Sequence, residues 1–218
     1  MEQDDTVEQD DTLRIAVLDA GPIGLEVTLY ARYLGYAVQT FATEGLCPTV
    51  ERLSSSAMGG PFRQNCSTLG LAALDAHDAN YEPPRADEIL TGRQWLDGYL
   101  LPLSRTDLIA DSLRLRHTVL AVEYVDSDET FVIRVRDGAA GIVQTEIVDY
   151  LVDTRAQAGI GFPSSKDVGE PTIFSACDAE DFFIVAVETF PNGLDQIRRI
   201  FARVGERKDL DIYATLKR

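Results

Sequence analysis

Residues 13–41 carry the strongest structural signal in the chain and read LRIAVLDAGPIGLEVTLYARYLGYAVQTF. The segment opens with a short run that is apolar except for Arg14, which is typical of a strand buried in a parallel sheet. After a turn, apolar residues recur at helical spacing up to Gly35, which fits the position just past a helix end. A second strand is expected over 36–41. This order of elements, over about thirty residues, predicts a right-handed βαβ unit.

The turn after the first strand contains part of a dinucleotide-binding motif. The three glycine positions of Gly-x-Gly-x-x-Gly fall on Asp19, Gly21 and Gly24, so the second and third match. Such glycines let the backbone approach a pyrophosphate at a helix N-terminus, where N–H groups and the helix dipole favour an anion. A carboxylate at position 19 would oppose that anion. The cofactor-binding residues expected at this turn are Ala20, Gly21, Pro22, Ile23 and Gly24.

A dinucleotide fold also places an acidic residue near the end of the second strand, where it binds the ribose hydroxyls. Glu44 lies twenty residues after Gly24 and three after Phe41, and is the candidate for this role. The competing interpretation of Glu44 is an acid on a solvated loop.

Length, composition and charge exclude several classes of protein. The chain has 218 residues, of which 45% are hydrophobic and 26% charged, as expected of a globular domain. Its net charge of −16 disfavours nucleic acid as a partner, and no apolar run is long enough to span a membrane. Three cysteines without a CxxC pair argue against a disulfide framework or a zinc site. We therefore expect a cytoplasmic protein with no metal and a small-molecule partner; the oligomeric state stays open.

The first twelve residues contain the pentapeptide EQDDT twice, at 2–6 and 8–12. Its acidic side chains have no counter-charge before Arg14, so residues 1–12 are expected to form a disordered acidic tail. The remaining residues, 13–218, are expected to form one domain without a second nucleotide-binding domain.

The rest of the chain is predicted to add helices and a strand-rich block. A short helix is expected over 69–74, and a longer helix over 86–114 with a break at Pro102. A buried face on that longer helix is expected from Trp95, Leu96, Tyr99, Leu100 and Leu103. Strands are expected over 118–125, 130–136, 142–147, 148–153 and 182–187, with a loop over 155–171 and a last helix over 194–204. The overall prediction is an α/β fold with a parallel sheet and a small antiparallel β-meander.

At this point the sequence resembles a known family. The segment IAVLDAGPIGLE (15–26) is similar to the FAD-binding start of two-dinucleotide flavoproteins, among them flavin-containing monooxygenases and pyridine nucleotide–disulfide oxidoreductases. LTGRQWLDGYLLPL (90–103) resembles the helix before that family's β-meander, and VDYLVDT (148–154) resembles the strand that returns toward the flavin. The resemblance covers roughly 14–154. It implies a Rossmann-like flavoprotein fold and an oxidoreductase that binds FAD, with NAD(P) as the second candidate cofactor.

The sequence also departs from the family in ways that leave its activity open. Asp19 replaces a glycine, Ala42 stands where the family usually has its ribose-binding acid, and Arg155 stands where the family has a glycine. No second Gly-x-Gly-x-x-Gly occurs. One interpretation is an FAD-dependent oxidoreductase; the alternative is a non-catalytic remnant of such a flavoprotein that acts as a weak binding or interaction module. No side chain stands out as an acid–base catalyst. Arg63, Gln64 and Asn65 are additional candidates for lining a cofactor pocket.

Overall fold

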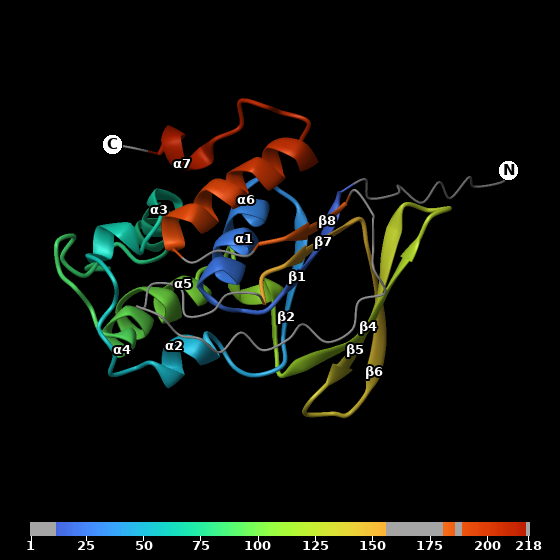
Figure 1. Cartoon of the computed structure of the whole chain (residues 1–218), viewed down its shortest axis with the longest axis horizontal. Coiled ribbons are helices and arrows are strands. Elements are labelled where there is room, and N and C mark those ends of the chain that lie inside the picture. Colours follow the sequence, from blue (N-terminus) through green and yellow to red (C-terminus); the bar gives the residue numbers. More distant parts are fainter. Residues whose placement is uncertain (1–11, 156–180, 186–188, 217–218) are drawn as a thin grey trace, which may run out of the picture.

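The computed structural model describes residues 12–155, 181–185 and 189–216 (Figure 1). Nearly all of the acidic repeat, the loop expected after Arg155, and Cys177 lie outside the described residues. No helix in the described ranges is long and apolar enough to cross a membrane.

The βαβ unit predicted at the start of the chain forms the centre of a five-stranded parallel sheet. The strands of this sheet are β1 (Arg14–Leu18), β2 (Ala37–Ala42), β3 (Leu113–Leu115), β7 (Tyr150–Asp153) and β8 (Phe182–Ile184), in the order β3-β2-β1-β7-β8. Helix α1 (Pro22–Tyr33) connects β1 to β2. Gly35 follows the helix with φ +89, a backbone conformation that suits glycine and ends the helix as expected.

A three-stranded antiparallel sheet forms the predicted β-meander. It consists of β4 (His117–Val125), β5 (Thr130–Asp137) and β6 (Val143–Val148), in the order β4-β5-β6. Every second residue of β5 is buried, beginning with Phe131, as the alternating pattern predicts. The α/β fold class, with a parallel sheet and an antiparallel meander, is therefore confirmed.

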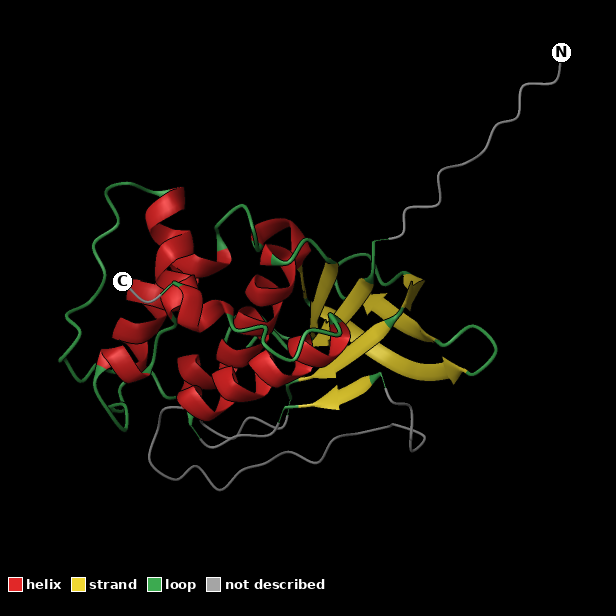
Figure 2. Ribbon diagram, turned by 90° about the horizontal axis from the view of Figure 1, so that it is seen from above, coloured by secondary structure: helices red, strands yellow, loops and turns green. Residues whose placement is uncertain are grey.

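The parallel sheet is the middle one of three layers, with helices on one side and the meander on the other (Figures 1 and 2). Successive side chains of β1 point to opposite faces of the sheet, and both faces are covered by other parts of the chain. Ile15 and Val17 belong to the larger core on the helical side, whereas Ala16 and Leu18 pack with Phe131 and its neighbours of the meander. Burial on both faces is typical of a parallel strand and accounts for the continuous apolar run.

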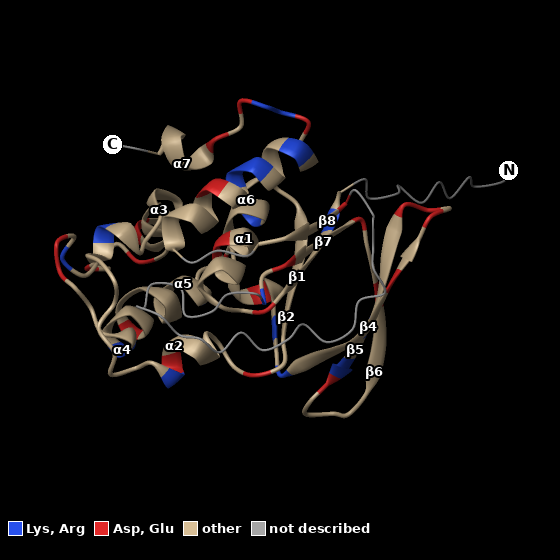
Figure 3. Ribbon diagram, in the orientation of Figure 1, with Lys and Arg blue, Asp and Glu red and all other residues tan. Residues whose placement is uncertain are grey.

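The helical layer is built from α1, α2 (Pro48–Arg52), α3 (Thr68–His77), α4 (Gly92–Trp95), α5 (Leu101–Ser104), α6 (Phe190–Val204) and α7 (Ile212–Thr215). Helix α3 is longer than the expected 69–74, and α6 begins at Phe190, earlier than the expected Leu194. Acidic and basic residues both occur along α6 (Figure 3), where Asp195 pairs with Arg198 and Arg199. Strand β8 ends at Ile184, and residues 186 and 187 of the strand expected over 182–187 lie outside the described residues.

The prediction of one helix over 86–114 is wrong at both ends. The segment before Thr91 is not helical, because its backbone accepts hydrogen bonds from the chain around residue 60: the Met58 N–H donates to the Leu90 carbonyl at 2.9 Å and the Phe62 N–H to the Glu88 carbonyl at 2.8 Å. Leu113–Leu115 forms strand β3 at the edge of the parallel sheet, paired with β2. In both places tertiary hydrogen bonds override the local pattern.

Helical structure continues through Pro102, where a break was expected. A π-helical turn, Leu96–Leu100, joins α4 to α5 just before the proline. Proline cannot donate to the carbonyl four residues earlier. That carbonyl belongs to Gly98 and accepts instead from the Tyr81 hydroxyl at 2.7 Å. The buried face expected on this segment is confirmed, since Trp95, Leu96, Tyr99, Leu100 and Leu103 are all buried.

Candidate functional site

The turn between β1 and α1 is held in a conformation that suits glycine better than aspartate. Asp19 has φ +86. This conformation is strained for a residue with a Cβ, whereas glycine adopts it without that strain. Its N–H donates to the Phe41 carbonyl at 2.8 Å, so the turn is tied to β2. Gly21 caps α1 in an extended conformation, and Pro22 occupies the first turn. Proline starts a helix well but contributes no N–H to a ligand at the helix N-terminus.

The Asp19 carboxylate turns back onto the N-terminus of α1. Its Oδ2 accepts a hydrogen bond from the Gly21 N–H at 3.1 Å. Burial raises the pKa of Asp19 to about 6, and the backbone N–H groups of Gly21 and Ala20 oppose this rise. The chain therefore places an acid of its own at the helix terminus where a dinucleotide fold receives a phosphate anion.

Gly24 lies where the helix crosses closest to the sheet. A Cβ on Gly24 would overlap the Asp19 carbonyl oxygen and lie 3.1 Å from Thr154 Oγ1. Thr154 follows β7, and its hydroxyl donates to the Leu18 carbonyl at 2.7 Å. The third glycine of the motif thus keeps its usual role of close helix–strand packing.

A recess of about 190 Å³ opens beside this turn, at the carboxyl ends of β1 and β2. Parallel α/β sheets bind their ligands at this edge. The floor is apolar and includes Leu18 and Phe41. The polar residues that line the recess are Asp19, Thr43, Glu44, His117 and Arg155. Residues distant in sequence therefore converge on Asp19 of the turn. The five cofactor-binding residues expected there do not line the recess: Ala20, Gly21, Pro22, Ile23 and Gly24.

Glu44 lies in the wall of this recess, where the sequence predicts a ribose-binding acid. Its Oε2 is 3.2 Å from the Arg52 guanidinium, and both side chains are 61% exposed. Its carbonyl accepts from the Arg116 N–H at 3.0 Å, which fixes the main chain beside β4. The carboxylate is thus near the cavity but in an exposed ion pair.

The cationic side chain of the recess belongs to Arg155, which sequence reasoning noted only as a departure from the family pattern. Its Nη2 lies 2.8 Å from Oδ2 of the buried Asp153, and its Nε donates to Oδ1 at 3.0 Å. The positive charge of Arg155 also lowers the pKa of Asp19, against the larger effect of burial. The feature of the sequence that could have identified Arg155 is its position just after β7. Because β7 is parallel to β1 and paired with it, the carboxyl ends of both strands lie at the same edge of the sheet.

Several other candidates do not line this recess. Asn65 is buried elsewhere, and its amide donates to the carbonyls of Gly60 and Pro61 at 3.3 and 3.1 Å. Arg63 and Gln64 precede it and are also absent from the lining. Cys47 is buried, and its thiol donates to the Ala20 carbonyl at 3.4 Å, so it contacts the main chain of the turn. Within the described ranges, no group of His, Cys, Asp or Glu could hold a metal ion.

A second recess, of about 310 Å³, lies at the opposite, amino edge of the parallel sheet. Three arginines and two carboxylates line it, and Arg14 among them is paired with Asp149 at 3.0 Å. This edge is not where open α/β sheets bind their ligands. The recess beside Asp19 is therefore the candidate site.

Comparison with solved structures gives the same fold. Bacillithiol disulfide reductase Bdr (YpdA) from Bacillus cereus matches with a TM-score of 0.51 and 12% identity over 66% of this chain and 39% of that chain. OTEMO in complex with FAD and NADP matches with a TM-score of 0.51 and 16% identity over 68% of this chain and 26% of its own. Oxidized steroid monooxygenase bound to NADP matches with a TM-score of 0.50 and 17% identity over 65% and 26% of the two chains.

These similarities show that the chain shares a fold with these proteins, and the matches span well under half of the neighbours' chains. No protein-family model matches the sequence, and no curated protein matches it.

Proposed function

We propose that this chain is a flavoprotein-type oxidoreductase domain that binds FAD at the turn between β1 and α1, in a manner controlled by Asp19. The observation that carries the proposal is the recess at the carboxyl ends of β1 and β2, where Asp19, whose carboxylate accepts from the Gly21 N–H, lies with Glu44 and Arg155. OTEMO, whose structure is a complex with FAD and NADP, shares the fold. A bound flavin would supply the redox chemistry, whereas the chain would position it and exclude water.

The residues of the turn suit a pyrophosphate in shape but not in charge. Gly24 permits the close packing of α1 on β1, and the helix N-terminus favours an anion. The ionised Asp19 carboxylate opposes that anion and occupies the Gly21 N–H. In addition, about 190 Å³ is below the roughly 300–1,000 Å³ of ordinary ligand pockets. We infer that binding requires Asp19 to be neutral and to move off Gly21.

In that bound state, each polar residue of the recess has a separate role. Gly21 would donate its N–H to a phosphate oxygen, and Arg155 would place a cation beside the diphosphate. Glu44 would leave Arg52 and accept from the ribose hydroxyls. NAD(P) is the second candidate for the same turn, because both dinucleotides carry a diphosphate and an adenosine ribose.

A non-catalytic role is the alternative, and one observation favours it. Asp19 supplies within the chain the negative group that a cofactor phosphate would otherwise bring to the helix N-terminus. A fold whose anion site is occupied in this way could persist without cofactor and act as a weak binding or interaction module. The two proposals differ in whether the wild-type chain binds flavin.

Titration with FAD, followed by flavin fluorescence at pH 7.5, tests the proposal. With a pKa of about 6, only about 3% of Asp19 is neutral at that pH, so we expect Asp19→Asn to bind roughly 30-fold more tightly than the wild type. Asp19→Gly is expected to bind more tightly still, because it also frees the Gly21 N–H and relieves the positive φ.

Asp75→Asn provides the matched control. Asp75 is an exposed residue of α3, so its substitution makes the same charge change away from the recess and is expected to leave FAD affinity at the wild-type value. If neither Asp19 variant binds FAD, the flavoprotein proposal is wrong and the non-catalytic alternative stands.

A further inference from the structure

Helix α1 carries one acid, Glu26, which does not line the recess. Its side chain has no exposed surface. The Tyr99 hydroxyl donates to Glu26 Oε1 at 2.8 Å, and the Tyr213 hydroxyl lies 3.4 Å from Oε2. Among the described residues, the groups that shift the pKa of this carboxylate are hydroxyls, and no Lys, Arg or His is one of them. A buried acid without a cation is disfavoured in its charged form, because water no longer solvates it.

The groups that face Glu26 come from three other elements and are all neutral at neutral pH. Ser67 caps α3, Tyr99 belongs to the π-helical turn, and Tyr213 belongs to α7. Cys66 lies near the same carboxylate, and burial together with the Glu26 charge raises the pKa of its thiol to about 12. Burial is also the main reason that the pKa of Glu26 rises to about 7, while the hydroxyls of Tyr99, Ser67 and Tyr213 oppose this rise.

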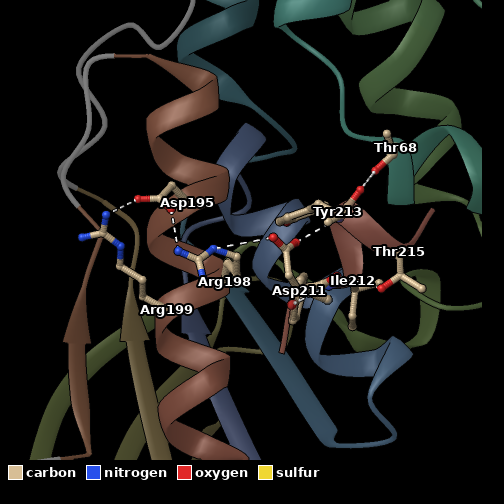
Figure 4. A network of polar contacts seen from close by, with 10 residues as sticks. Thr68, Asp195, Arg198, Arg199, Asp211, Ile212, Tyr213 and Thr215 are labelled. Carbon is tan, nitrogen blue, oxygen red and sulfur yellow. Dashed lines mark hydrogen bonds and ion pairs between the residues drawn. The ribbon is translucent and has the colours of Figure 1, made fainter. Parts of the chain in front are cut away.

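Of these three elements, α7 is the shortest. It spans only Ile212–Thr215 and follows an exposed loop over 206–209. The Ile212 N–H donates to the Tyr30 hydroxyl at 3.1 Å, and the Thr68 hydroxyl donates to the Tyr213 carbonyl at 2.8 Å. Asp211 caps the helix and lies 3.9 Å from Arg198 of α6 (Figure 4). Tyr213 thus reaches the buried acid from a short segment near the end of the chain.

In contrast, Ser67 and Tyr99 are fixed within the helical core. The Tyr99 hydroxyl accepts from the Ser67 N–H at 3.1 Å, and the ring packs edge-on against Phe62 with centroids 5.6 Å apart. Moving either residue would disturb α3 and the π-helical turn together. Withdrawing α7 would break the contacts named above, remove the buried Leu210, Ile212 and Tyr213 from the core, and expose the Glu26 carboxylate to water.

We propose that α7 is a proton-dependent latch, which stays docked while Glu26 carries a proton and detaches when Glu26 ionises. The site accommodates a neutral carboxyl, whereas an ionised one loses more solvation on burial than the hydroxyls of Tyr99, Ser67 and Tyr213 restore. Because the pKa is higher in the docked state than the ordinary 4.5, the stabilisation of docking is fully present below about 4.5 and is lost as the pH rises through about 7.

Hydrogen exchange of residues 210–216 tests the latch in the whole chain, from pH 6 to pH 9, with rates corrected for intrinsic exchange. We expect protection of this segment to fall at least tenfold over that range, while α6 keeps its protection. Glu26→Gln should remove the pH dependence, because the amide cannot ionise. Glu82→Gln, at an exposed position, should behave as the wild type.

A second variant keeps the test decisive if Glu26→Gln does not fold. Tyr213→Phe retains the ring contact with Tyr30, whose centroid lies 5.0 Å away, and removes only the hydroxyl that faces Glu26. Because that hydroxyl lowers the pKa of Glu26, we expect this variant to keep the pH dependence and to lose protection at a higher pH than the wild type. Wild-type protection that is constant from pH 6 to pH 9 overturns the proposal, as does an equal loss of protection in α6.

Discussion

Replacing Gly24 with alanine is expected to destabilise the fold by about 3 kcal/mol, the upper end of the usual cost of overpacking a core. The added Cβ would overlap the Asp19 carbonyl oxygen, which is main chain and cannot rotate away. Helix α1 would have to move off β1, although all but its last two residues are buried. For a chain of this length the loss corresponds to a fall in Tm of roughly 6–12 °C, measured by thermal unfolding under circular dichroism.

Gly45→Ala is the matched control for this substitution. Gly45 is exposed, and a Cβ there meets no atom within 4 Å. Its Tm should stay within about 2 °C of the wild type, since surface substitutions usually change stability by no more than about 0.5 kcal/mol. Equal unfolding temperatures for Gly24→Ala and the wild type would mean that α1 and β1 are not packed as closely as described.

The βαβ unit could be predicted from sequence because local pattern and tertiary environment agree there. The run ending at Leu18 is apolar on both faces because the helices cover one face and the meander the other. Trp95 and Tyr99 occupy neighbouring turns of one helical face and are both buried. In such segments the spacing of apolar residues is enough to predict both the element and its buried side.

Two segments were mispredicted because distant parts of the chain decide their conformation. Leu113–Leu115 has too few residues for a periodic signal, and it is a strand because the edge of β2 is available for pairing. Residues 86–91 are held by hydrogen bonds to the chain near Met58 and Phe62. A single sequence does not reveal such pairings.

In the candidate site, too, some features follow from local sequence and others depend on distant parts of the chain. Gly21, Gly24 and Glu44 could be selected from motif spacing, because that spacing follows the main chain through one βαβ unit. The structure adds that the Asp19 carboxylate faces the Gly21 N–H and that Arg155 lies in the same recess. The second fact depends on β7 lying beside β1, which is a property of the sheet order.

Lowering the pH is expected to strengthen FAD binding by the wild-type chain, in a transition centred near pH 6. The pKa of Asp19 is raised to about 6 mainly by burial, so the neutral form is about 90% populated at pH 5 and about 1% at pH 8. If only the neutral form admits the diphosphate, the apparent affinity should fall roughly 90-fold between these two pH values. Flavin fluorescence titrations at a series of pH values measure this slope.

The Asp19→Asn variant distinguishes the effect of Asp19 ionisation on FAD binding from the effects of all other titrating groups. Asp19→Asn should bind FAD at pH 8 about as tightly as the wild type does at pH 5, and its affinity should change little with pH. Asp75→Asn should retain the full wild-type slope. Glu26 also titrates near neutral pH, but its carboxyl lies on α1 away from the recess, so Glu26→Gln should leave the slope unchanged. A slope that persists in Asp19→Asn would show that another group controls binding, and Asp19 would then be only a structural residue of the turn.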